Sequence, residues 1–186
     1  MGGKFMYEIN IFDRIRMPLD WATVYCGINS NLLSIDIAHE FACRKLEHGE
    51  QMSEEELELS WNSNNRLDVL ELLEKILNMQ GNVDENVKNA KDKIRTALII
   101  YMRDTEKDLI RLLEQIAIIY AEFDYPTDME NFIMYMPNND EQHIWPDNTC
   151  DNNRKLLLCK LDAFIDNKVK EYQLRRGYHA IRLEEE

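Results

Sequence analysis

The chain has 186 residues, of which 45% are hydrophobic and 31% are charged, and its formal net charge is −13. This length and this hydrophobic content exclude intrinsic disorder and allow a core that needs no disulfide or metal to hold it together. The acidic excess disfavours nucleic-acid binding, and the longest apolar run, which carries Arg111 and Glu114, is too short and too charged to span a membrane.

Glycines and capping residues divide the chain into helical segments. Each of four glycines follows a segment with the apolar period of a helix, at the place where a left-handed residue would end that helix. These glycines are Gly27, Gly49, Gly81 and Gly177. In chain order, we predict helices over residues 18–27, 34–48, 53–61, 65–80, 83–103 and 105–124, a short one over 128–135, and a last one over 153–176.

Residues that favour helix starts agree with these segments. Pro18 suits a first helical turn, and Ser53 with Glu56 matches the pattern of a capping box. Thr127 with Glu130 matches the same pattern at the start of the short helix. Further caps are predicted at Ser34, Asn82 and Thr105.

The predicted fold class is all-α. Residues 109–123 are apolar on more than one face, which indicates the central helix of a bundle. Strand signals are confined to "YEINIFD" near the start and "YHAIRL" near the end, and these segments either pair as a small ribbon or remain extended arms. We therefore expect a single-domain bundle of about seven to eight helices over residues 1–186, with residues 1–6 as an unstructured end and 177–186 as a tail.

The negative charge is concentrated in two blocks. Residues 47–86 carry eleven acidic and two basic residues, and residues 121–151 carry eight acidic residues and no lysine or arginine. One interpretation is that basic helices elsewhere in the chain neutralise these blocks and leave a solvated surface with no binding role. The other is that a block forms a docking surface for a basic protein, because clustered carboxylates accelerate encounter with a cationic partner.

The second block also contains aromatic residues, the type that supplies most of the binding energy in protein interfaces. Phe132, Ile133 and Met136 match the buried side of the short predicted helix, whereas the polar loop that follows holds a tryptophan that must rest on its own domain or on a partner. The acidic helix from Glu54 to Glu58 is a second candidate. In the second block, the candidate partner-binding residues are Asp124, Asp128, Glu130, Tyr135, Asp140, Glu141, Trp145 and Asp147.

Motifs for nucleophilic catalysis and phosphate binding are absent from the sequence, and the four cysteines lie far apart without a CxxC pair, as is typical of reduced thiols in a cytosol. We therefore predict no catalytic residue, no cofactor and no metal. The enzyme alternative uses two ExxE pairs, Glu55 with Glu58 and Glu71 with Glu74, which on antiparallel helices can hold magnesium against a nucleoside triphosphate. This arrangement resembles that of the all-α nucleoside triphosphate pyrophosphohydrolases of the MazG kind, whose second pair is usually ExxD.

The stretch "MPLDWATVYCGINSNLLSIDIAHEFACRKLEHG", residues 17–49, resembles the start of a family of small bacterial proteins catalogued only as a domain of unknown function. The residues that carry the resemblance are Leu19, Trp21, Tyr25, Gly27, Ser34, Asp36, Ile37 and Ala42. The resemblance implies a cytoplasmic bacterial protein, with some relatives linked to toxin loci in which acidic immunity proteins neutralise basic toxin domains.

The resemblance and the charge map together favour a non-catalytic, cytoplasmic protein-binding domain, an immunity-type inhibitor of a basic protein partner such as a toxin domain. Such an inhibitor works by occlusion, and the active-site cleft of a nuclease toxin is cationic because its substrate is a polyanion. Carboxylates of the inhibitor would then stand in for phosphates. A third alternative is an acidic DNA mimic, which requires carboxylates at phosphate-like intervals along one face.

Overall fold

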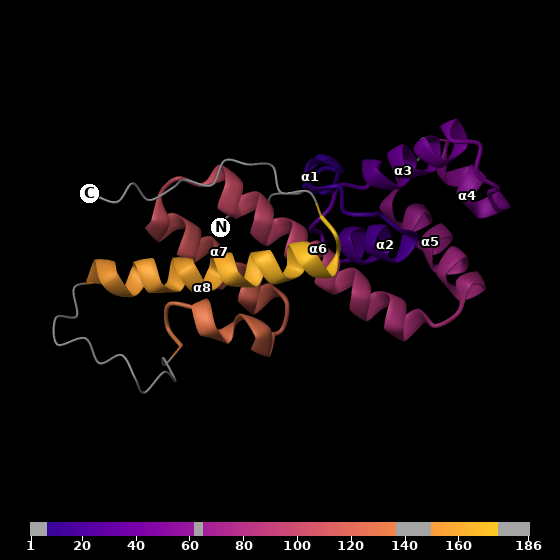
Figure 1. Cartoon of the computed structure of the whole chain (residues 1–186). Helices are drawn as coiled ribbons and strands as arrows, with labels where there is room; N and C mark the ends of the chain where they lie inside the picture. The colour runs from indigo at the N-terminus through magenta and orange to yellow at the C-terminus, as the bar shows by residue number, and fades with distance from the viewer. Residues whose placement is uncertain (1–6, 62–64, 137–149, 175–186) are drawn as a thin grey trace. The chain divides into compact units, whose positions relative to one another are not determined.

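A computed structural model describes residues 7–61, 65–136 and 150–174 (Figure 1). Within these residues every regular element is helical, so the predicted all-α fold class is confirmed. The elements are α1 Asn10–Ile15, α2 Trp21–Asn29, α3 Asp36–Glu47, α4 Glu54–Leu59, α5 Arg66–Gln80, α6 Val83–Thr105, α7 Leu109–Glu122, the 3-10 helix η1 Thr127–Phe132, and α8 Cys150–Glu171. The chain divides into two compact units, Met1–Ile94 and Arg95–Glu186. Helix α6 contributes to both. In the described part, no helix is long and apolar enough to cross a membrane.

The first unit is built on α2 and α5, which pack against each other, while α4 packs on α5 and α3 packs on α4. Helix α2 begins where the Asp20 side chain accepts a hydrogen bond from the Thr23 backbone N–H at 2.8 Å. The apolar residues of α2 and α5 recur at helical spacing and are buried. They are Trp21, Val24 and Ile28 in α2, and Val69, Leu72, Leu73, Ile76 and Leu77 in α5.

The segment near the start that was predicted as a ribbon strand or an extended arm, residues 7–13, is instead helical from Asn10 onward. Ile11, Phe12 and Ile15 of α1 are all buried, and their spacing fits one face of a helix better than the alternation of a strand. Within this segment the one strand-like pairing is that of Tyr7, whose N–H donates to the Leu32 carbonyl at 2.8 Å in an isolated bridge with Leu33. The second predicted arm, residues 178–183, lies outside the described residues.

Two of the four glycines end helices as predicted. Gly49 follows α3 with φ +69° and Gly81 caps α5 with φ +72°, both in the left-handed region. Gly27 does not end a helix, because α2 continues to Asn29. A Cβ on Gly27 would lie only 2.2 Å from Cδ1 of the Leu33 side chain, so this glycine is required by close packing. Gly177 lies outside the described residues.

The predicted helix starts have mixed outcomes. Ser53 and Glu56 form the complete capping box of α4. The predicted box of Thr127 is wrong, because η1 is a 3-10 helix that begins after Pro126 without a side-chain cap. Thr105 ends α6, and α7 is capped by Asp108, whose carboxylate accepts from two backbone N–H groups. Ser34 is not the N-cap of α3, because Ile35 occupies that position. Pro18 does not lie in the first turn of α2, because this helix begins three residues later, at Trp21.

In the second unit, α8 packs on η1 and on α7, and the rings of Phe132 and Phe164 meet at 5.1 Å. Helix α7 is less central than predicted, because Ile118 on its outer face is largely exposed. The four successive residues 97–100 of α6 are all buried, so α6 is covered on every side at this point. Although the sequence of α6 is more polar than that of α7, α6 therefore contains the more buried segment.

Glu56 fixes α4 to the rest of the first unit. Its buried carboxylate accepts hydrogen bonds from the Trp21 indole N–H and from the Ser53 backbone N–H, the latter at 2.9 Å, and Lys45 Nζ lies 3.2 Å away. Burial by itself would raise the pKa of Glu56, but the hydrogen bonds from Ser53, Trp21 and Lys45 lower it below its ordinary value of 4.5. The ionised form is thus the one that the fold stabilises.

We expect the Glu56→Gln variant to be less stable than the parent protein at neutral pH by about 1–3 kcal/mol, because it loses charge-assisted hydrogen bonds. Since the folded-state pKa of Glu56 is lowered, its contribution is complete above pH 4.5 and is lost as the pH falls through the folded-state value. The difference between the two proteins should therefore shrink below about pH 4. Chemical unfolding at several pH values measures the difference in unfolding free energy between the two proteins. Glu58→Gln, at an exposed position of the same helix, is the control. A difference between Glu56→Gln and the parent protein that does not vary with pH would contradict the prediction.

Candidate functional site

The described start of the second acidic block, residues 121–136, contains an irregular turn after α7. Two successive residues, Asp124 and Tyr125, have φ of +60° and +57°, the left-handed region that bulky residues rarely enter. The turn is held by the Tyr125 N–H, which donates to the Tyr120 carbonyl at 2.9 Å, and by the Asp124 N–H, which donates to the Ala121 carbonyl at 3.3 Å. Helix α7 thus ends without a glycine, at a cost of about 1–2 kcal/mol for each left-handed residue.

Three tyrosines gather at this turn. Tyr120 is buried, and its ring lies 5.2 Å from that of Tyr125 in an edge-on arrangement and 6.3 Å from that of Tyr135. Tyr125 and Tyr135 remain 60% and 59% exposed. We call Asp124, Tyr125, Asp128, Glu130 and Tyr135 the tyrosine surface. Desolvation raises the pKa of Tyr120, and the negative charge of Glu130 raises it further.

The acids of the tyrosine surface differ in how far they are neutralised. Both oxygens of Asp128 accept hydrogen bonds from the guanidinium of Arg95, at 2.7 and 2.6 Å. Arg95 is only 6% exposed and lies over the ring of Phe164 at 6.0 Å, so Asp128 serves as the counter-ion of a buried cation. Asp124 and Glu130 make no ion pair with another described residue.

The structure therefore brings together four of the eight residues predicted from the sequence. Asp124, Asp128, Glu130 and Tyr135 lie between the end of α7 and the residues that follow η1. The other four, Asp140, Glu141, Trp145 and Asp147, lie outside the described residues. Tyr125 was missing from the prediction, although its position directly after Asp124 and directly before Pro126 marks a turn that could present it.

Three of the four glutamates of the enzyme alternative, Glu55, Glu58 and Glu71, lie near Lys75. Lys75 binds Glu71 at 3.0 Å, and this contact raises the pKa of Lys75, with smaller contributions from Glu58 and Glu55. Glu74 instead accepts a hydrogen bond from the Tyr25 hydroxyl at 2.9 Å. Lys75 thus lies where a cation would be needed, and among the described residues no group of three or more histidines, cysteines or acids could hold a metal ion.

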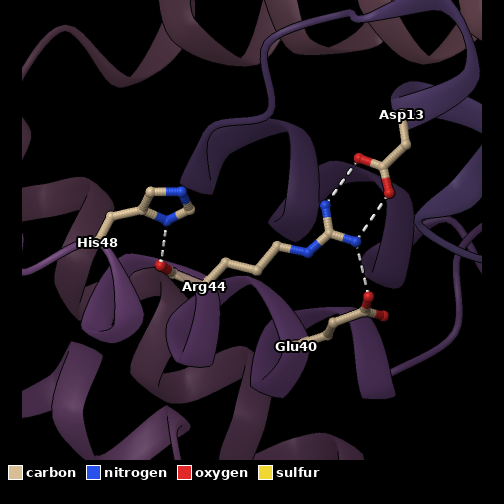
Figure 2. A network of polar contacts seen from close by, with 4 residues as sticks. All are labelled: Asp13, Glu40, Arg44 and His48. Atoms are coloured by element: carbon tan, nitrogen blue, oxygen red, sulfur yellow. Dashed lines mark hydrogen bonds and ion pairs between the residues drawn. The ribbon is translucent and has the colours of Figure 1, made fainter.

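A pocket of about 490 Å³ between α1 and α3 was not anticipated from the sequence. Figure 2 shows its Arg44 donating to both oxygens of Asp13, each at 2.7 Å, and to Glu40, also at 2.7 Å, while His48 Nδ1 lies 2.6 Å from the Arg44 carbonyl oxygen. The hydrogen bond with Asp13 raises the pKa of Arg44. Because Arg44 is engaged on two carboxylates, its role is to join α1 to α3. In the sequence, the one feature that could have indicated these contacts is the spacing of Glu40 and Arg44, which are four residues apart on a helix.

The Cys26 thiol is unreactive, and the Cys43 thiol lies beside a histidine. Cys26 is buried in α2, and burial raises the pKa of its thiol to about 11, so it is protonated and inert at neutral pH. Cys43 Sγ lies 3.7 Å from the His39 ring, but these are two ligands where a structural zinc requires four.

Residues 9–169 match the model of a family described as an uncharacterised protein conserved in bacteria (DUF2247). No curated protein and no solved structure matches the chain.

Proposed function

The chain belongs to the DUF2247 family of uncharacterised bacterial proteins, and from this premise we propose that it is a non-catalytic protein-binding domain. Its partner is a basic protein, which it inhibits by occlusion in the manner of a cytoplasmic immunity protein acting on a toxin domain. The tyrosine surface makes the contact.

The observation that carries this proposal is the strained presentation of Tyr125. A bulky residue in the left-handed region costs stability, and such strain gathers at sites where the exposed geometry is used. Here the strain turns an aromatic side chain outward beside a second exposed tyrosine, and both rings rest on the buried Tyr120. Tyrosines held in this way are suitable binding anchors, because little conformational entropy remains to be lost.

The charges beside the tyrosines select the partner. Asp124 and Glu130 offer uncompensated carboxylates at the edge of the aromatic cluster, where they would speed encounter with a cationic surface and repel nucleic acid. A nuclease cleft has the complementary charge, because it binds phosphates. The proposed role of the acids is orientation and association rate, while the tyrosines supply the binding energy.

A photo-crosslinking experiment tests this proposal. A benzophenone amino acid replaces Tyr125 or Tyr135 in the native bacterium, with the same replacement at Ile110 as control. Ile110 is a part-exposed residue ten positions before Tyr120 on the same helix, about 15 Å away along it. We expect both tyrosine positions, but not Ile110, to capture one basic protein. Capture of only acidic proteins, or equal capture from Ile110, would refute the proposal.

The purified partner then allows a quantitative prediction. We expect Tyr125→Ala together with Tyr135→Ala to weaken binding roughly tenfold or more, as loss of central aromatic anchors does. Asp124→Asn, which suits the left-handed backbone and removes only the charge, should lower the association rate and its salt dependence with little effect on dissociation. Surface plasmon resonance at two salt concentrations separates these effects, and a stoichiometric loss of the partner's own activity would establish inhibition.

A further inference from the structure

The outer side of α4 exposes two large apolar residues among acids. Trp61 is 78% exposed and Leu57 is 41% exposed. They are four residues apart, and the Trp61 N–H donates to the Glu58 carbonyl at 3.0 Å, so Trp61 continues the last turn of the helix on the same side as Leu57. Exposed beside them are Glu54 and Glu58, with Glu55 partly exposed. We call these five residues the α4 surface.

The α4 surface is attached rigidly to the first unit. Glu56 and Leu59, on the opposite side of the helix, are both buried, and the Glu56 carboxylate binds the Trp21 indole N–H. The capping box fixes the first turn, and the Ser60 hydroxyl donates to the Leu57 carbonyl at 2.6 Å in the last. A helix as short as α4 would not be stable alone, so these contacts are what hold Trp61 and Leu57 outward.

The carboxylates of the α4 surface make no direct ion pair with the bases of their own acidic block, although Glu55 and Glu58 lie near enough to Lys75 to raise its pKa. Glu54, Glu55 and Glu58 form no hydrogen bond or ion pair through their side chains with another residue of the described ranges. The two bases of residues 47–86 are engaged elsewhere. Lys75 binds Glu71, and Arg66 donates to the Ile28 carbonyl at 2.8 Å and to the Asn29 carbonyl at 3.0 Å, at the end of α2.

We propose that the α4 surface binds a basic amphipathic helical segment of a protein, with apolar side chains on Trp61 and Leu57 and lysines or arginines on the flanking glutamates. Exposed apolar residues with a rim of one charge sign match a segment that has an apolar stripe and the opposite charge. Pairing with a second copy is disfavoured, because it would bring glutamates against glutamates. The inference does not depend on the tyrosine surface, since every residue involved belongs to the first unit.

The probe is a synthetic peptide of about 14 residues, some four helical turns, with leucines on one face and lysines on the other. On binding, we expect the tryptophan emission of the protein to shift to shorter wavelength, because Trp61 leaves water. The shift should disappear in Trp61→Phe, although the other two tryptophans of the chain remain. Fluorescence anisotropy of the labelled peptide should show affinity reduced roughly tenfold by Trp61→Ala and several-fold by Glu55→Gln with Glu58→Gln.

Matched controls make the outcome decisive. Met79→Ala removes another exposed apolar side chain, in the last turn of α5, and should leave binding unchanged. A leucine–glutamate peptide should not bind, and a serine–lysine peptide should bind much more weakly than the leucine–lysine one. Equal binding of the serine–lysine peptide, or unchanged affinity in Trp61→Ala with a native circular dichroism spectrum, would overturn the proposal. Loss of affinity in Tyr125→Ala instead would assign the peptide to the tyrosine surface.

Discussion

Replacing Gly27 by alanine is expected to lower the free energy of unfolding by about 1–3 kcal/mol, the range for an overpacked core. In an exposed helix the same substitution stabilises by about 0.5–1 kcal/mol, so the expected effect has the opposite sign. The reason is a clash with the Leu33 side chain. The new Cβ would lie 2.2 Å from Leu33 Cδ1 and 2.4 Å from Leu33 Cγ. Leu33 is buried and cannot move away without displacing its neighbours. Guanidinium unfolding followed by circular dichroism measures the change.

A double-mutant cycle tests whether the contact with Leu33 is the cause. Leu33→Ala alone should destabilise the protein, because it leaves a cavity. In that background the clash is gone, so Gly27→Ala should become neutral or stabilising by up to about 1 kcal/mol, through the higher helix propensity of alanine. If Gly27→Ala were stabilising in the parent protein as well, the close approach of Leu33 would be refuted.

Replacing Asp128 by alanine is expected to destabilise the protein by about 3 kcal/mol, through loss of the counter-ion of Arg95. Breaking a buried ion pair from one side typically costs about 3–5 kcal/mol, and the low end applies here because the Asp128 side chain is part exposed. The two hydrogen bonds lost are those from the Arg95 guanidinium, at 2.7 and 2.6 Å. Thermal and chemical unfolding of the variant give the value.

Two further variants separate this structural role from partner binding. Asp124→Asn removes a neighbouring charge that has no ion-pair partner in the described part of the chain, and it should change stability by less than about 0.5 kcal/mol. Combining Asp128→Ala with Arg95→Met replaces the cation by an apolar side chain and should recover most of the lost stability. Equal stability of Asp128→Ala and Asp124→Asn would mean that the ion pair contributes nothing.

These results would divide the acidic residues of the second block by role. Asp128 balances an internal cation, so its replacement is expected to affect folding first. Asp124 and Glu130 face outward, so their replacement is expected to affect association first. Alanine scanning for binding should therefore be read together with stability at each position, because a destabilised variant can mimic a lost contact.

The candidate site was predictable only in part. The run of acids with interspersed aromatic residues pointed to Asp124, Glu130 and Tyr135, which lie near one another because they are close in sequence; their role in partner binding stays a prediction. The sequence did not reveal that Asp128 faces a buried arginine 33 positions away, or that Tyr125 stands exposed in a left-handed conformation. The exposure of Trp61 could not be recognised from the sequence either, because tryptophans are usually well buried, as Trp21 is.

The amino-acid sequence by itself determined the helical class and the approximate position of most helices. Apolar period, the Ser53 capping box and the left-handed Gly49 and Gly81 are local signals, set by contacts within about one helical turn. Tertiary structure alone decided the roles of Gly27, Glu56 and Asp128. Gly27 depends on the packing of Leu33, six positions further on, and the two carboxylates depend on Trp21 and Arg95, which are distant from them in sequence. Neither the steric demand at Gly27 nor the compensation of the two carboxylates could therefore be derived before the fold was known.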